Sequence, residues 1–166
     1  MERYTLSVLV ENHPGVLSRV VGLFSRRGFN IHSLSVGTTQ DNTVSRITIE
    51  VNGDAATVEQ VSKQLSKLVD IIKIKTLRDH EIVKRGLALI KVKVGPKTRS
   101  EVIEITSVFR ANIVDISPST MTAEITGNNS KIKAFIDLLE PYGIEEISRT
   151  GMTALERGAN TLKLDK

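Results

Sequence analysis

A chain of 166 residues is long enough for one medium domain or two small ones, and its formal net charge of +4 makes it only mildly basic. Because the chain contains no cysteine, disulfides, thiolate zinc sites and cysteine nucleophiles are excluded together. No apolar run is long enough to span a membrane, and the N-terminus enters a strand-like pattern without the features of a signal peptide, so we expect a cytoplasmic protein with no membrane partner.

The first part of the chain contains six segments with the hydrophobic period of a strand or a helix. Apolar residues at every second position predict strands near 4–10, 29–36, 47–51 and 72–74. The alternation of the second strand slips between Ile31 and Leu34, which indicates a bulge near Ser33. Apolar residues spaced by three or four predict two helices, whose buried stripes are Leu17, Val20, Val21 and Phe24 in one, and Val58, Val61, Leu65 and Leu68 in the other.

The same order of elements, strand, helix, strand, strand, helix, strand, recurs later in the chain. Residues 78–86 are charged and carry no apolar period, so we interpret them as a linker. Residues 1–77 and 87–150 are each predicted to form a ferredoxin-like βαββαβ domain of the α+β class, in which both helices cover one face of an antiparallel sheet. Residues 151–166 are predicted to form a loosely held tail with one helical turn at 154–157.

The stretch from Glu11 to Arg19, between the first strand and the first helix, has a composition that suits the binding of a small ligand. Pro14 can occupy the first helical position, and Gly15 has no side chain to keep a ligand away. Free amides at a helix N-terminus attract a carboxylate or phosphate, and Asn12 offers both a donor and an acceptor. The same residues are also common in an ordinary loop capped by Asn12. The stretch therefore predicts either a site for a small anionic or zwitterionic molecule or a plain helix cap.

Other kinds of site find little support in the sequence. The three histidines, His13, His32 and His80, are too few and too irregularly spaced for a metal site. Neither a nucleophile elbow nor a phosphate-binding loop with Gly-Lys-Ser/Thr occurs. Ferredoxin-like sheets that bind RNA stack bases on aromatic residues, but aromatics make up only 4% of this chain, so we expect no nucleic-acid partner.

The residues Leu6 to Val20, Gly22 to Phe24 and Arg27 to Ile31 resemble the ACT domain of the regulatory small subunit of acetohydroxyacid synthase, also called acetolactate synthase. The resemblance continues through both predicted domains, at 45–49, 64–70, 109–115 and 149–151. It implies a homodimer in which two N-terminal ACT domains pair edge to edge into one eight-stranded sheet. The feedback inhibitor, usually valine, would bind where the two domains meet.

The resemblance also implies a separate catalytic large subunit that carries thiamine diphosphate, magnesium and usually FAD and condenses pyruvate into acetolactate. This chain would then hold no cofactor and catalyse no reaction. Asn12, Gly15 and Asn30 match the ligand positions of the family, and the neighbouring backbone that should complete the site belongs to Pro14, Val16, Leu17 and Ile31.

Valine suits these residues chemically. The helix N-terminus can accept its carboxylate, an amide oxygen of Asn12 or Asn30 can accept a hydrogen bond from its ammonium group, and Val16, Leu17 and Ile31 can offer an apolar slot. One methylene changes binding in such a slot by only about 1 to 3 kcal/mol, so the residues do not specify which branched-chain amino acid binds. A free-standing amino-acid sensor that regulates transcription or another enzyme remains the alternative, and an enzyme with an unfamiliar site is a third hypothesis.

Overall fold

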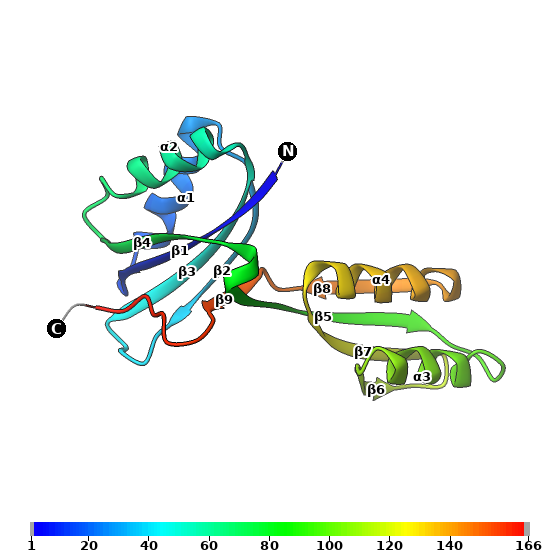
Figure 1. Ribbon diagram of the computed structural model, residues 1–166. Helices are drawn as coiled ribbons and strands as arrows, with labels where there is room; N and C mark the ends of the chain where they lie inside the picture. Colours follow the sequence, from blue (N-terminus) through cyan, green and yellow to red (C-terminus); the bar gives the residue numbers. More distant parts are fainter. Residues whose placement is uncertain (1, 165–166) are drawn as a thin grey trace. The chain divides into compact units, whose positions relative to one another are not determined.

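The computed structural model describes residues 2–164 and contains two compact units (Figure 1). Among the described residues, the first unit is built from two separate segments, 2–84 and 151–164, and the second from the continuous segment 85–150. Each unit has its own sheet and its own hydrophobic core.

The first unit has one antiparallel sheet with the strand order β2-β3-β1-β4. Its elements are β1 (Glu2–Glu11), α1 (Val16–Arg27), β2 (Ile31–Thr38), β3 (Val44–Gly53), α2 (Ala55–Leu65) and β4 (Ile71–Leu77). Both helices lie on the same side of the sheet in Figure 1, over the alternate positions that hold its core residues. The register of β2 against β3 shifts between Ile31 and Ser33, which confirms the predicted bulge.

The second unit repeats this topology, with the strand order β6-β7-β5-β8. Its elements are β5 (Ile82–Lys93), α3 (Arg99–Val108), β6 (Asn112–Ile116), β7 (Thr120–Gly127), α4 (Asn129–Leu139) and β8 (Ile144–Arg149). Its core contains Ile90 and Val92 of β5, Ile132 and Phe135 of α4, and Met121 of β7. The prediction of an α+β protein with two ferredoxin-like βαββαβ units is therefore confirmed.

The buried stripe of α1 differs from the predicted one. Val20 and Phe24 are buried as expected, but the stripe is completed by Val16 and Leu23, which are 4% and 7% exposed. Leu17 and Val21 are instead exposed on the side of the helix. Apolar residues occupy two overlapping stripes of this helix, so the spacing alone does not distinguish them, and the position of the helix on the sheet decides which one is buried.

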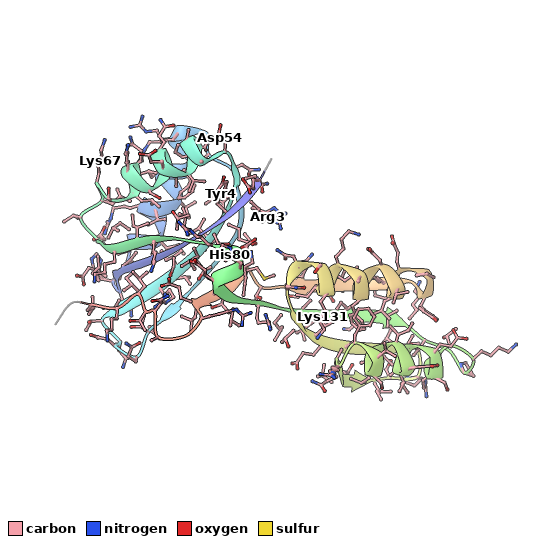
Figure 2. All side chains as sticks on the ribbon, viewed as in Figure 1. Arg3, Tyr4, Asp54, Lys67, His80 and Lys131 are labelled. Atoms are coloured by element: carbon pink, nitrogen blue, oxygen red, sulfur yellow. The ribbon has the colours of Figure 1, made fainter. Side chains whose placement is uncertain are left out.

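The ends of the α2 and α4 helices follow ordinary capping rules. The Asp54 carboxylate accepts a hydrogen bond from the Thr57 amide at 2.7 Å, and the Asn128 side chain accepts one from the Lys131 amide at 2.9 Å. In Figure 2, Asp54 and Lys67 lie near the two ends of α2, and Lys131 lies in the first turn of α4.

The predicted linker and part of the predicted tail form regular structure. A 3-10 turn, η1 (Asp79–Glu81), follows β4, and β5 already begins at Ile82, where the sequence predicts a linker. The predicted helical turn at 154–157 is wrong, because Thr153–Glu156 form a strand, β9, that pairs with β5. Met152 and Ala154 are each 2% exposed while their neighbour Thr153 is exposed, which is the alternation of a strand rather than of a helix.

The segment 151–164, which we call the C-terminal segment, lies on the face of the first sheet that the helices leave open (Figure 1, orange to red). Ser35 donates a hydrogen bond to the Met152 carbonyl at 2.6 Å, and Arg46 donates one to the Leu162 carbonyl at 2.9 Å. A Cβ on Gly151 would lie 2.3 Å from the Leu34 carbonyl oxygen, so only glycine allows this approach to β2. The C-terminal segment is therefore part of the first unit.

Candidate functional site

The loop between β1 and α1 is built around Gly15. Gly15 is the N-cap of α1 and has a φ of 89° and a ψ of −13°, a left-handed conformation that strongly favours glycine. The helix begins at Val16, so the prediction that Pro14 occupies the first helical position is wrong, and Pro14 lies in the turn before it. The proline ring holds φ near −65°, and therefore the left-handed turn into the helix falls on the glycine.

Asn12 does not cap the helix either. Its side-chain amide donates a hydrogen bond to the Asn42 carbonyl at 2.7 Å, and its backbone amide donates one to the Thr43 carbonyl at 2.8 Å. These two bonds fix the loop to the β2–β3 hairpin, whereas α1 has no side-chain cap at all. The plain helix cap that the sequence allowed is therefore absent at this position.

The N-terminal amides of α1 are left open by this arrangement. The first helical hydrogen bond runs from the Arg19 amide to the Gly15 carbonyl at 3.0 Å. Within residues 2–164, the amides of Leu17 and Ser18 have no backbone acceptor. Such amides carry the partial positive charge of the helix N-terminus, and the absence of a Cβ on Gly15 leaves room beside them.

Asp70 anchors this loop from a distant part of the chain. Its side chain is only 7% exposed and accepts from Arg19 Nε at 2.6 Å, while His13 Nε2 lies 3.0 Å from its other oxygen. The Asp70 backbone carbonyl also accepts a hydrogen bond from the Glu11 amide at 2.9 Å. The hydrogen bond from Arg19 lowers the pKa of Asp70 below its usual value, and the charges of Arg19 and His13 act in the same direction against the opposing effect of burial.

The guanidinium of Arg19 lies against Gly15. A Cβ on Gly15 would be 3.2 Å from Arg19 Nη1, so the cationic end of this side chain borders the open amides. The predicted ligand residues did not include Asp70 or Arg19, although Arg19 ends the stretch that the sequence indicated, and His13 was considered only as a metal ligand. Arg19 could have been found as the residue one helical turn after Gly15, but nothing in the sequence connects Asp70 to the loop.

The remaining predicted residues lie elsewhere in the first unit. Ile31 pairs with Val51 at one end of β3, whereas Glu11, the residue before Asn12, pairs with Val44 at the other end. Seven residues of strand separate these rows, which is on the order of 23 Å. A single first unit therefore cannot bring Asn30 and Ile31 to the loop that contains Asn12.

The three apolar residues of the predicted slot have different environments. The Val16 side chain belongs to the core, so only its backbone faces the loop. Leu17 is 39% exposed beside the loop, and Ile31 is partly buried against the core at the opposite end of the sheet. Leu17 is therefore the apolar side chain that the loop itself presents.

The described residues contain no group of histidine, aspartate or glutamate side chains that could hold a metal ion. His13 contacts Asp70, and His80, on η1 in Figure 2, lies 3.5 Å from a carboxylate oxygen of Glu81. None of the described helices is both long enough and apolar enough to cross a membrane.

The chain combines two βαββαβ units with a glycine-capped helix whose open N-terminal amides lie beside an arginine. Residues 6–73 match the family described as the AHAS small subunit-like ACT domain, and residues 85–158 match the family of the small subunit of acetolactate synthase.

Individual relatives agree with these families over nearly the whole chain. The chain is 53% identical to the probable acetolactate synthase small subunit of Archaeoglobus fulgidus over 156 residues. This alignment covers 94% of this chain and 98% of that protein. It is 53% identical over 155 residues to the acetolactate synthase small subunit of Mycobacterium bovis, covering 93% and 92% of the two chains. The crystal structure of the small subunit from Thermotoga maritima superposes with a TM-score of 0.90 at 41% identity, covering 96% of this chain and 100% of that one.

The chain belongs to the family of acetolactate synthase small subunits. It is therefore a regulatory subunit, and the catalytic activity, with its cofactors, belongs to the large subunit of acetolactate synthase.

Proposed function

We propose that this regulatory subunit activates the large subunit of acetolactate synthase and makes it sensitive to feedback inhibition by valine. Valine binds at the loop of residues 12–15, at an interface between two copies of the chain. The large subunit carries thiamine diphosphate, magnesium and FAD and condenses pyruvate, so this chain acts only by changing the state of its partner. The observation that carries the proposal is the glycine-capped α1, with its open amides held beside a guanidinium.

The charges around the loop suit a zwitterion. The amides of Leu17 and Ser18 and the guanidinium of Arg19 all favour a carboxylate, and they lie on the same turn of α1. The Asn12 side chain uses its amide nitrogen to bind Asn42, which leaves its amide oxygen to accept a hydrogen bond from an ammonium group. The exposed Leu17 then provides an apolar contact for a branched side chain.

The topology supports a site shared by two copies. β2 is an edge strand of the first sheet, so its outer backbone groups can pair with another strand. Antiparallel pairing of β2 with β2 of a second copy reverses the direction of the second sheet. The end of that sheet with Asn30 and Ile31 then lies at the end of the first sheet that contains Asn12. The family's ligand residues, separated within one chain, thus meet across the homodimer.

Regulation follows from binding at an interface. A ligand held by both copies stabilises one arrangement of the dimer relative to others and biases the activity of the large subunit accordingly. Thermodynamic reciprocity then requires that binding of the large subunit changes the affinity for valine by the same factor.

The experiment that tests the proposal mixes this chain with a thiamine-diphosphate-dependent large subunit and measures acetolactate formation with and without valine. We expect stimulation by the chain and inhibition of the stimulated rate by valine. A free-standing sensor would leave turnover unchanged, and that result would contradict the proposal.

The variant Gly15→Asp locates the site. Its carboxylate would face the carboxylate of valine, so we expect stimulation to persist and the valine concentration for half inhibition to rise by at least about tenfold, or ~1.4 kcal/mol. Gly15→Ala introduces the same backbone strain without a charge, and Gly95→Asp places the charge in the second unit, where a side chain meets no atom within 4 Å. Unchanged valine inhibition in Gly15→Asp would move the site elsewhere.

A further inference from the structure

The open face of the first sheet is polar and yet largely buried. Its outward positions include Thr5, Ser7, Thr48 and Glu50, each at most 2% exposed. The C-terminal segment covers this face, and a cavity of about 320 Å³ remains between the segment and the sheet. Its lining includes charged side chains from both sides, together with Leu77 of β4 and Leu162 of the segment.

Glu156, on β9, lines this cavity and has one buried carboxylate oxygen without a hydrogen-bond donor among the described residues. Its side chain is only 7% exposed, and one oxygen forms an ion pair with Lys75 Nζ at 2.7 Å. The other oxygen is buried and accepts no hydrogen bond from any described residue. A buried carboxylate oxygen without a donor costs free energy. A molecule that donates a hydrogen bond to this oxygen would therefore stabilise the fold.

Arg46, on β3, contributes an unpaired cation to the same cavity. Its partly buried guanidinium donates to Ser7 Oγ at 2.8 Å and to the Leu162 carbonyl at 2.9 Å, and both acceptors are neutral. Within the described chain it forms no ion pair, although Glu156 is near enough to influence its charge. Burial lowers the pKa of Arg46, and the negative charge of Glu156 opposes this effect.

A single small molecule could satisfy both groups. Glu156 needs a hydrogen-bond donor and Arg46 needs an anionic acceptor, and the two line one cavity without forming an ion pair with each other. An α-amino acid carries an ammonium group and a carboxylate on adjacent atoms. The cavity lies at the small end of the range for ligand sites, and Leu77 and Leu162 provide apolar contacts for a short aliphatic side chain.

We propose that this cavity is a second amino-acid site, in which Arg46 binds the carboxylate and Glu156 the ammonium group of a small aliphatic α-amino acid. It is separate from the loop of residues 12–15, because Arg46 faces the side of the sheet that α1 and α2 do not cover. Since β9 and Leu162 belong to the C-terminal segment, a bound amino acid joins this segment to the sheet. Binding therefore reduces the opening of residues 157–162.

The test is equilibrium dialysis of the full chain with labelled L-valine, compared with isobutylamine and 3-methylbutanoate, which lack one charge each. We expect two valines per chain in the wild type, and one in each of Gly15→Asp and Glu156→Gln. Each singly charged analogue should bind the second site at least about tenfold more weakly, since it leaves one charge unpaired. Glu145→Gln removes a surface carboxylate paired with Lys93 in the second unit and should leave the count at two.

The outcomes separate the two sites. If Gly15→Asp binds no valine while the wild type binds one, only the loop site exists and the proposal is overturned. One valine in both proteins, lost in Glu156→Gln, would support the second site and contradict the loop site. If the wild type binds no valine, both sites are contradicted.

Hydrogen exchange gives a second readout in case Glu156→Gln folds poorly. In Gly15→Asp, which retains Arg46 and Glu156, valine should slow the exchange of amides in residues 157–162 and leave the second unit unchanged. Exchange that valine does not alter would also overturn the proposal.

Discussion

Asp70 holds three parts of the chain around the loop of residues 12–15, through its buried side chain and its backbone carbonyl. Through Glu11 it holds the end of β1, through His13 the loop itself, and through Arg19 the first turn of α1. Because Arg19 is held through Nε, Nη1 of its guanidinium is positioned beside Gly15, although the side chain is 47% exposed. Asp70 therefore positions Arg19 although the two residues are 51 positions apart in the sequence.

Replacing Asp70 should weaken the proposed valine site. In Asp70→Asn the charge that orients Arg19 and His13 is lost, so we expect valine inhibition to need a several-fold higher concentration while stimulation of the large subunit persists. The measurement is a valine titration of the reconstituted enzyme. Asp137→Asn, which removes an exposed carboxylate paired with Lys133, is the matched control. Equal titrations for both variants would contradict the role of Asp70.

The pH dependence of stability should identify the same carboxylate. The pKa of Asp70 is lowered in the folded chain from the usual value of 3.8, so its charged form stabilises the fold above the unfolded pKa. This contribution is lost as the pH falls through the lowered folded pKa. We therefore expect the difference in unfolding free energy between wild type and Asp70→Asn to be constant near neutral pH and to shrink below about pH 4 in urea titrations. A difference that grows with acidity would contradict this assignment.

Gly151 is the residue on which the approach of the C-terminal segment to β2 depends. In Gly151→Ala the new Cβ would meet the carbonyl of Leu34, which is backbone and cannot rotate away, so we expect a loss of about 1 to 3 kcal/mol of stability. The control is Gly37→Ala. Gly37 lies on β2 with Leu34, and a Cβ there would meet no atom within 4 Å, so this variant should change stability much less. The measurement is urea unfolding with hydrogen exchange across residues 152–162, and protection of these amides equal to that of wild type would contradict the prediction.

At the scale of elements, hydrophobic periods predict where strands and helices occur, but they do not always predict which face is buried. Apart from β9 and the first residues of β5, the strands and helices of both units occur where the spacing indicates them, because each period follows from local backbone geometry. α1 has apolar residues on two overlapping stripes, and only its packing on the sheet selects one of them. The stripe that is not buried contains Leu17, which is therefore exposed beside the loop of residues 12–15.

A matched pair of variants tests the orientation of α1. Val20 is fully buried and Val21 is 41% exposed, although the sequence places both on the predicted stripe. We expect Val20→Ala to cost about 2 kcal/mol, from the loss of two buried methyl groups and the cavity they leave, and Val21→Ala to cost less than about 1 kcal/mol. The comparison is made by urea denaturation, and equal costs would mean that the helix is rotated from the described orientation.

At the scale of the whole molecule, the proposed effector site depends on two copies of the chain. The loop of residues 12–15 and the pair Asn30 and Ile31 lie at opposite ends of one sheet, so a complete site needs a second sheet in the reverse direction. The dimer is then a requirement for binding, and loss of the dimer should abolish valine inhibition.

Mixed dimers test this requirement. Gly15→Asp and Asn30→Ala should each lack both interface sites as homodimers while keeping the cavity of Arg46 and Glu156 in each chain. A heterodimer of the two variants places both substitutions in one interface site and leaves the other intact. We therefore expect a heterodimer to bind one more valine than either variant homodimer, measured by calorimetry on heterodimers purified with two different tags. If each loop site lay within one chain, the heterodimer would have no intact loop site and would bind no more valine than the homodimers.

The sequence by itself determined the two ferredoxin-like units, because strand and helix periods are local properties of the chain. It also indicated the loop around Gly15 as a candidate site, from residue types that are local as well. Only the tertiary structure showed that Asp70 fixes Arg19 and His13, since that contact spans 51 residues. Likewise, only the tertiary structure showed that the C-terminal segment packs on the first sheet and that Arg46 and Glu156 line one cavity. Contacts between distant segments depend on how strands align across a sheet, and no local pattern of residues records that alignment.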